Sequence, residues 1–134
     1  MKFGAHAFVW EAEWNDQSAK RVMEGAAKVG LDFVEIPLLH PESFDGAKTK
    51  QMLEEHGLTA AFSLGLPADR SLPENPQGAE RFLKEALAKI KETGSDALTG
   101  VTYGTLGELT GRPPTEEDYR VIAKTLKNVA REAQ

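Results

Sequence analysis

Cysteine is absent from the 134 residues of this chain. Without it, the chain has no disulfide framework, no thiolate nucleophile and no zinc site built on cysteine. No segment approaches the roughly 20 consecutive apolar residues that a membrane-spanning helix needs, and no signal peptide is recognisable at the N-terminus. These absences lead us to expect a cytoplasmic protein that does not enter a membrane.

An excess of positive charge is also missing, because 16 lysines and arginines stand against 21 aspartates and glutamates, for a net charge of −5. That balance argues against a nucleic-acid-binding surface. Arg112 precedes two prolines and is expected to be a solvated loop residue. Neither G-x-G-x-x-G nor Gly-Lys-Ser/Thr occurs, so no phosphate-binding loop is indicated. The remaining composition, 40% hydrophobic and 28% charged, is typical of one globular domain, which we expect to span residues 1–134.

Short apolar runs alternate with amphipathic stretches along the whole chain. The apolar runs predict strands at residues 3–9, 31–39, 58–64 and 95–103, and the periodic stretches predict helices at 19–29, 47–56, 79–93 and from 116 onward. Gly30, Gly57 and Gly94 end the first three helices, while Asp45 and Thr115 are candidate N-caps. The order is a βα unit repeated four times, which predicts a parallel sheet with right-handed crossovers.

Four βα units of about 33 residues each are half of what an eight-stranded barrel of roughly 250 residues contains. Four strands cannot close a barrel, so the first and last strands would be open edges beside side chains meant for a barrel interior. We therefore predict an α/β fold that is the (βα)4 half of a TIM barrel, completed to eight parallel strands by homodimerisation. The alternative is a small doubly wound open sheet with helices on both faces.

Polar and aromatic residues stand near the ends of the predicted strands, where α/β proteins place their binding sites. His6 lies in the first strand, as either a binding group or a hydrogen-bonded core residue. Trp14 follows that strand, as either an aromatic platform for a ligand or a hydrophobic lid. Glu35 lies among apolar residues, where a carboxylate must be paired or protonated. A metal set of His6, Glu35 and His40 is conceivable, although its spacing matches no recognised ligand pattern.

Four stretches carry a resemblance to a known family: AFVWEAEW (residues 7–14), GLDFVEI (30–36), GLTAAFSLGL (57–66) and, more loosely, TGVTYG (99–104). They resemble the first four strands of the ketose 3-epimerases, the D-tagatose/D-psicose 3-epimerase group of the xylose-isomerase-like barrels. The first stretch is similar to the W-x-x-E-W end of that family's first strand. The resemblance covers the whole chain but only half of the family's fold, which implies an N-terminal half-barrel.

In that family a divalent metal, usually manganese, holds the ketose, and two glutamates move the proton at C3. The metal ligands and both glutamates come from later strands, so the resemblance implies no cofactor, no metal ligand and no catalytic residue in this chain. It implies instead that the chain supplies part of the sugar pocket through seven residues: His6, Trp14, Ser63, Gly65, Gly100, Thr102 and Leu106. Leu106 stands where the family has an aromatic residue.

The expected function is therefore that of the N-terminal half-barrel of a metal-dependent ketose 3-epimerase or sugar isomerase, inactive on its own. The expected partners are a second copy of the chain or a complementary C-terminal half-barrel, and, by resemblance, a ketose sugar. One alternative is a designed or standalone half-barrel scaffold that self-associates and has no substrate. Another is a small metalloenzyme that uses His6, Glu35 and His40 at a dimer interface.

Overall fold

The computed structural model describes residues 1–133. Its elements run β1 (Gly4–His6), α1 (Asp16–Lys28), β2 (Phe33–Pro37), α2 (Gly46–His56), β3 (Thr59–Gly65), α3 (Pro76–Thr93), β4 (Leu98–Val101) and α4 (Glu116–Glu132). Short 3-10 turns at Ala7–Val9, Pro41–Ser43 and Ala68–Arg70 follow the first three strands. The order confirms the fourfold βα repeat. Among the described residues, none of the helices has the length and apolar content that crossing a membrane requires.

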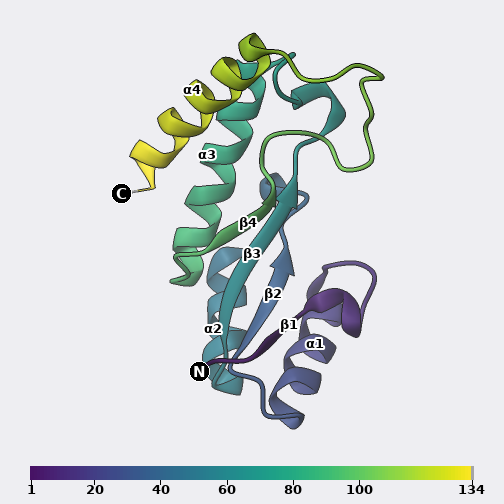
Figure 1. Ribbon diagram of the computed structural model, residues 1–134. Coiled ribbons are helices and arrows are strands. Elements are labelled where there is room, and N and C mark those ends of the chain that lie inside the picture. Colours follow the sequence, from purple (N-terminus) through teal and green to yellow (C-terminus); the bar gives the residue numbers. More distant parts are fainter. Residues whose placement is uncertain (134) are drawn as a thin grey trace.

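The four strands form one parallel sheet in the order β1-β2-β3-β4 (Figure 1). Right-handed crossovers that always step in the same direction place every connecting helix on the same face of a sheet. The doubly wound alternative requires the strand order to reverse, so that helices cover both faces. The order does not reverse anywhere between residues 4 and 101, and the fold is a (βα)4 half-barrel.

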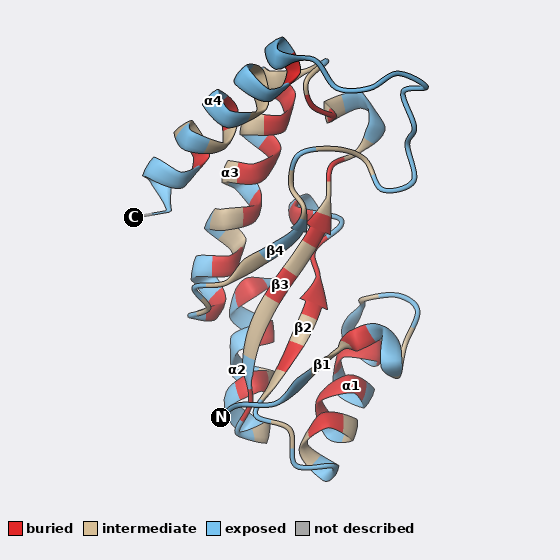
Figure 2. Ribbon diagram, viewed as in Figure 1, coloured by how far each residue is buried: buried red, intermediate tan, exposed pale blue. Residues whose placement is uncertain are grey.

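The core lies between the sheet and the helices α1, α2 and α3 (Figure 2). Val34 and Ile36 of β2 are fully buried there, as are Phe62 and, almost completely, Leu64 of β3. The three helices direct apolar side chains into the same cluster, namely Val22, Met23, Ala26, Leu53, Phe82, Leu83 and Ala86. One face of the sheet is therefore sealed by the chain itself.

Within residues 1–133, the opposite face of the sheet has no helix over it, because α1–α3 pack on the core side and α4 packs against α3 (Figure 1). Residues paired in register share a face, and side chains alternate between faces along a strand. His6 pairs with Glu35, Glu35 with Ala61, and Ser63 with Thr99, so these side chains point away from the core. All five are half-buried or exposed. We call this surface, defined by His6, Glu35, Ala61, Ser63 and Thr99, the open face.

Both outer strands also keep one free edge. In the described sheet, β1 pairs with β2 alone and β4 pairs with β3 alone. A closed barrel has no such edges, because each strand has a neighbour on both sides. The open face and the two free edges are together what four strands of an eight-stranded barrel present when the other four are removed.

Local capping chemistry explains the helix boundaries. The side chains of Asp45 and Thr115 accept the backbone N–H groups of the third residues of α2 and α4, which confirms both as N-caps. Gly57 and Gly94 adopt the left-handed conformation at the ends of α2 and α3. α1 begins three residues earlier than predicted, because Asn15 forms a reciprocal capping box with Ser18.

The strands are shorter than the apolar runs that predicted them. β2 covers Phe33–Pro37 within the predicted range 31–39, and β4 covers Leu98–Val101 within 95–103. β2 ends at Pro37, although the N–H of Leu38 still donates to the carbonyl oxygen of Ser63 on β3 over 2.8 Å. β4 ends because the chain turns at Thr102, two residues after Gly100, whose φ is +98°.

Candidate functional site

Polar side chains of the open face meet near the carboxyl ends of the first three strands. His6 is the last residue of β1, and its Nε2 lies 3.3 Å from Oγ of Ser63 on β3. The same nitrogen lies 3.9 Å from Oε1 of Glu35 on β2, the strand between them. The side chains of His6 and Glu35 are 30% and 35% exposed. An imidazole, a hydroxyl and a carboxylate are therefore presented together on an otherwise uncovered surface.

His6 also explains why β1 ends where it does. The N–H of Phe8 donates to Nδ1 of His6 over 3.1 Å, and Ala7–Val9 form a 3-10 turn. A side chain that accepts a hydrogen bond from two residues ahead competes with continuation of a strand. The rings of His6 and Phe8 also pack together, with centroids 4.4 Å apart. The predicted strand over residues 3–9 is therefore wrong beyond His6.

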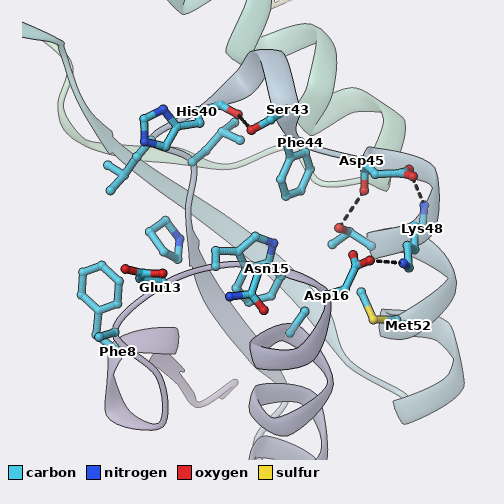
Figure 3. Close-up of a pocket in the computed structure, with 17 residues that line it drawn as sticks. Phe8, Glu13, Asn15, Asp16, His40, Ser43, Phe44, Asp45, Lys48 and Met52 are labelled. Carbon is cyan, nitrogen blue, oxygen red and sulfur yellow. Dashed lines mark hydrogen bonds and ion pairs between the residues drawn. The ribbon is translucent and has the colours of Figure 1, made fainter.

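Trp14 lines a cavity of about 420 Å³ between the β1–α1 and β2–α2 loops (Figure 3). The apolar part of its wall comes from both loops and from α2, with Phe8, Leu38, Phe44 and Met52 beside Trp14. Because Phe8 also packs against His6, this cavity adjoins the polar cluster of the open face. The structure thus connects two predicted pocket residues, His6 and Trp14, through a third that was not predicted.

The polar rim of this cavity is held in place by the first turns of α1 and α2. Oδ1 of Asn15 accepts the N–H groups of the second and third residues of α1, and Asp45 accepts the N–H of Lys48 at 2.9 Å. Nζ of Lys48 then lies 2.5 Å from Oδ2 of Asp16, which joins α2 to α1 (Figure 3). These side chains are occupied in building the walls, whereas Glu13 and His40 add further polar groups to the lining, so the cavity offers a ligand both apolar and polar surface.

The other predicted pocket residues lie around the ends of β3 and β4. Gly65 ends β3, and a Cβ built on it would lie 3.6 Å from Cβ of Leu106, so the two are neighbours. Leu106 is 80% exposed in the long β4–α4 loop. Gly100 pairs with Leu64, on the core side, and a Cβ there would overlap the Leu64 carbonyl oxygen. Thr102 is half-buried in the turn after β4.

The predicted residues thus divide into two kinds. His6 and Ser63 are in direct contact, and Gly65 is next to Leu106, whereas Gly100 lies in register with a core residue. At Gly100 the close approach of the backbone accounts for glycine without any ligand. A role in sugar binding stays a prediction for each of these residues.

Phe8 is a pocket residue that the sequence analysis did not predict, and it joins the cavity to the open face. It lies inside the apolar run that predicted a strand, and it is 52% exposed at the boundary between the cavity and the open face. The signal that could have marked it is a histidine two residues earlier, which can accept a hydrogen bond from the N–H of Phe8.

A metal site is not assembled by the described part of the chain. His40 pairs with Glu42 in the turn after β2, with 3.3 Å between Nδ1 and Oε1. Within residues 1–133, no three His, Cys, Asp or Glu side chains gather closely enough to hold a metal ion. The hypothetical set of His6, Glu35 and His40 is therefore not formed within one chain. The residues present do not fit the divalent metal that the resemblance implies for a whole enzyme.

Arg112 lies in the β4–α4 loop with its side chain 47% exposed, as expected, but it also pairs with a carboxylate. Its Nη1 lies 2.6 Å from Oδ2 of Asp118, and its Nη2 lies 3.2 Å from Oδ1. Oδ2 of Asp118 also accepts the N–H of Thr115 at 2.8 Å. The Arg112 hydrogen bond, followed by those from Thr115, holds the pKa of Asp118 well below its ordinary value of 3.8. The pair fastens the end of the β4–α4 loop to the first turn of α4.

No protein-family model matches the chain. The L-ribulose 3-epimerase of Methylomonas sp. (strain DH-1) is 35% identical over 127 residues, covering 92% of this chain and 44% of that protein. The ketose 3-epimerase of Arthrobacter globiformis is 34% identical over 110 residues, covering 79% of this chain and 38% of that protein. The chain spans less than half the length of these curated relatives.

Solved structures show the same relation. The D-allulose 3-epimerase from Methylomonas sp., crystallised in complex with D-allulose, has a TM-score of 0.92 at 32% identity, over 99% of this chain and 47% of that chain. A structure of L-ribulose 3-epimerase has a TM-score of 0.87 at 26% identity, over 98% of this chain and 46% of that one. Sequence and fold therefore agree on the same half of these proteins.

Proposed function

The chain corresponds in sequence and fold to the N-terminal half of a ketose 3-epimerase, and on that premise we propose that it forms one wall of a ketose-binding pocket. The observation that carries the proposal is the open face, with the cluster of His6, Ser63 and Glu35 near the carboxyl ends of parallel strands. In β/α barrels, ligands bind at that end of the strands.

The groups on this wall suit a sugar. A ketose presents many hydroxyl groups, and the imidazole, hydroxyl and carboxylate of the cluster offer both donors and acceptors. The aromatic face of Trp14 suits the apolar carbon-bound surface of a sugar. By resemblance, Gly65, Thr102 and Leu106 also contribute to this wall, whereas Gly100 lies in register with Leu64 on the core side.

We assign the chemistry of C3 epimerisation to another half-barrel. Removing a proton from a carbon beside a carbonyl requires a placed base and stabilisation of the charge that develops. The described residues contain no cluster of metal donors, and no step of the reaction is assigned to them. The chain alone is therefore expected to be inactive, and its proposed partner is a complementary C-terminal half-barrel.

Complementation tests this function. The C-terminal half of the Methylomonas relative, made as a separate polypeptide, is mixed with this chain and assayed for conversion of D-fructose to D-allulose. We expect turnover from the mixture and none from either half alone. The control is the Methylomonas enzyme split at the same position, which shows whether splitting itself is tolerated. Turnover from the split control, with none from the mixture, would contradict the proposal.

A second copy of this chain is the other partner that the structure favours, because β1 and β4 each keep a free edge. Two copies related by a two-fold axis would supply eight strands. That assembly would be a scaffold without a substrate, as the alternative hypothesis holds. Adding D-allulose separates the two functions: a pocket wall within the mixed enzyme is stabilised by the sugar, whereas a self-paired scaffold keeps the same melting temperature.

A further inference from the structure

The hydrogen bond at Nδ1 of His6 favours one of the two positions that the ring proton can occupy. Phe8 donates its backbone N–H to Nδ1 over 3.1 Å, so Nδ1 must offer a lone pair. In the neutral imidazole one nitrogen is a donor and the other an acceptor. This hydrogen bond therefore favours the neutral ring that carries its proton on Nε2, the nitrogen near Ser63 and Glu35.

Two other strands supply the neighbours of Nε2. Oγ of Ser63 lies 3.3 Å away and Oε1 of Glu35 lies 3.9 Å away. Within residues 1–133, His6 is the basic side chain that comes within 4.0 Å of Glu35. An ionised carboxylate is an acceptor only, so its negative charge favours a proton on the nitrogen that faces it. Glu35 and the N–H of Phe8 thus favour the same tautomer from opposite sides of the ring.

This arrangement also sets the direction of the Ser63 hydroxyl. When the oxygen of Ser63 accepts from Nε2, its own hydrogen remains available. Among the described residues, His6 is the hydrogen-bond partner of this side chain. The hydroxyl hydrogen can therefore be donated to a ligand oxygen on the open face.

We propose that Glu35 is a positioning residue, which holds His6 as an Nε2–H donor so that Ser63 presents its hydroxyl hydrogen to an oxygen of the bound ketose. Register supports this role, because Glu35 pairs with His6. Glu35 also lies two residues before Pro37, the register partner of Ser63, and is therefore farther from the carboxyl ends of the strands. Glu35 therefore acts through His6. The identity of the ligand rests on the proposed function, whereas the tautomer does not.

Nitrogen-15 NMR of the histidine side chains tests the tautomer in the chain alone. We expect His6 to show a bare Nδ1 and a protonated Nε2 at a pH where the ring is neutral. In E35Q the nitrogen-15 chemical shifts of Nδ1 and Nε2 should move toward each other, because the tautomer with the proton on Nδ1 becomes populated. E42Q is the matched control, since it removes the carboxylate from the exposed His40–Glu42 pair and leaves His6 alone. A protonated Nδ1 in the unmodified chain, or an unchanged His6 in E35Q, overturns the proposal.

Kinetics of the complemented enzyme test the consequence for the sugar. E35Q should lower kcat/KM by about two- to tenfold, the range for losing one oriented hydrogen bond. In an H6F background the same substitution should have no further effect, because its influence passes through the imidazole. A loss in E35Q that persists in full with H6F overturns the positioning role. If the unmodified mixture is inactive while the split control turns over, the proposed function fails, and the NMR result still decides the tautomer.

Discussion

Gly100 is the residue at which the backbone leaves least room for a side chain. Its φ is +98°, and a Cβ would overlap the carbonyl oxygen of Leu64. Both features penalise any other residue, so we expect Gly100→Ala to lower the free energy of unfolding by about 2 kcal/mol. Urea unfolding measures the difference. Gly104→Ala is the control, because no atom lies within 4 Å of a Cβ at that position, and it should change stability by less than about 0.5 kcal/mol.

Asp118 gives the chain a defined response to acid. Its folded-state pKa lies below its unfolded value, so its stabilising contribution is complete above about pH 4 and is lost as the pH falls through the folded pKa. We expect Asp118→Asn to lower the melting temperature at neutral pH, and the gap to the unmodified chain to narrow below about pH 4. Melting curves across this range measure the gap.

Glu117→Gln is the matched control for Asp118. Glu117 pairs with Arg120 one turn along the same helix, in an exposed ion pair, and such pairs contribute little to stability. Its substitution should leave the melting temperature nearly unchanged at both ends of the range. An Asp118→Asn gap that stays constant down to the lowest pH would show that the carboxylate is not selectively stabilised in the folded state.

For single residues, the sequence could predict where His6, Trp14 and Ser63 lie but not how their side chains interact. Parallel strands end on one edge of a sheet, so strand assignment alone brings their positions together. The orientation of the His6 ring depends on a backbone N–H and on side chains from two other strands, which no local pattern specifies. The sequence placed Arg112 in an exposed loop but could not show its ion pair, because Asp118 lies six residues further on, beyond two prolines.

Among the elements, α1 depends most clearly on its cap. Asn15 accepts two N–H groups of the first turn and lines the cavity beside Trp14. We expect Asn15→Ala to lower the free energy of unfolding by about 1 kcal/mol. Gln17→Ala is the control, since the Gln17 backbone N–H bonds to Asn15 and its side chain does not cap the helix. Equal effects in urea unfolding would show that the cap contributes nothing particular.

Element boundaries were predicted well where the signal is local and poorly where it is not. The helix caps act on backbone groups only a few residues away, so the residue types at the helix ends were enough to identify them. These caps are Asp45, Thr115, Gly57 and Gly94. The start of α1 was placed three residues late, because the reciprocal bond between Asn15 and Ser18 decides it. The first strand was predicted too long, because apolar character does not distinguish a strand from the 3-10 turn that His6 caps.

For the molecule as a whole, repetition was the decisive signal. Four βα units predicted a half-barrel, and the sequential strand order excludes the open doubly wound sheet. The sequence could not show which side chains the missing neighbours would cover. The structure identifies them as the open face and the free edges of β1 and β4.

The central claim is that another half-barrel covers this face, and sedimentation equilibrium tests it most directly. The chain is measured alone and after mixing with an equimolar C-terminal half of the Methylomonas relative. We expect the mixture to sediment with the summed mass of the two polypeptides. A chain that remains a compact, folded monomer both alone and in the mixture would contradict the claim.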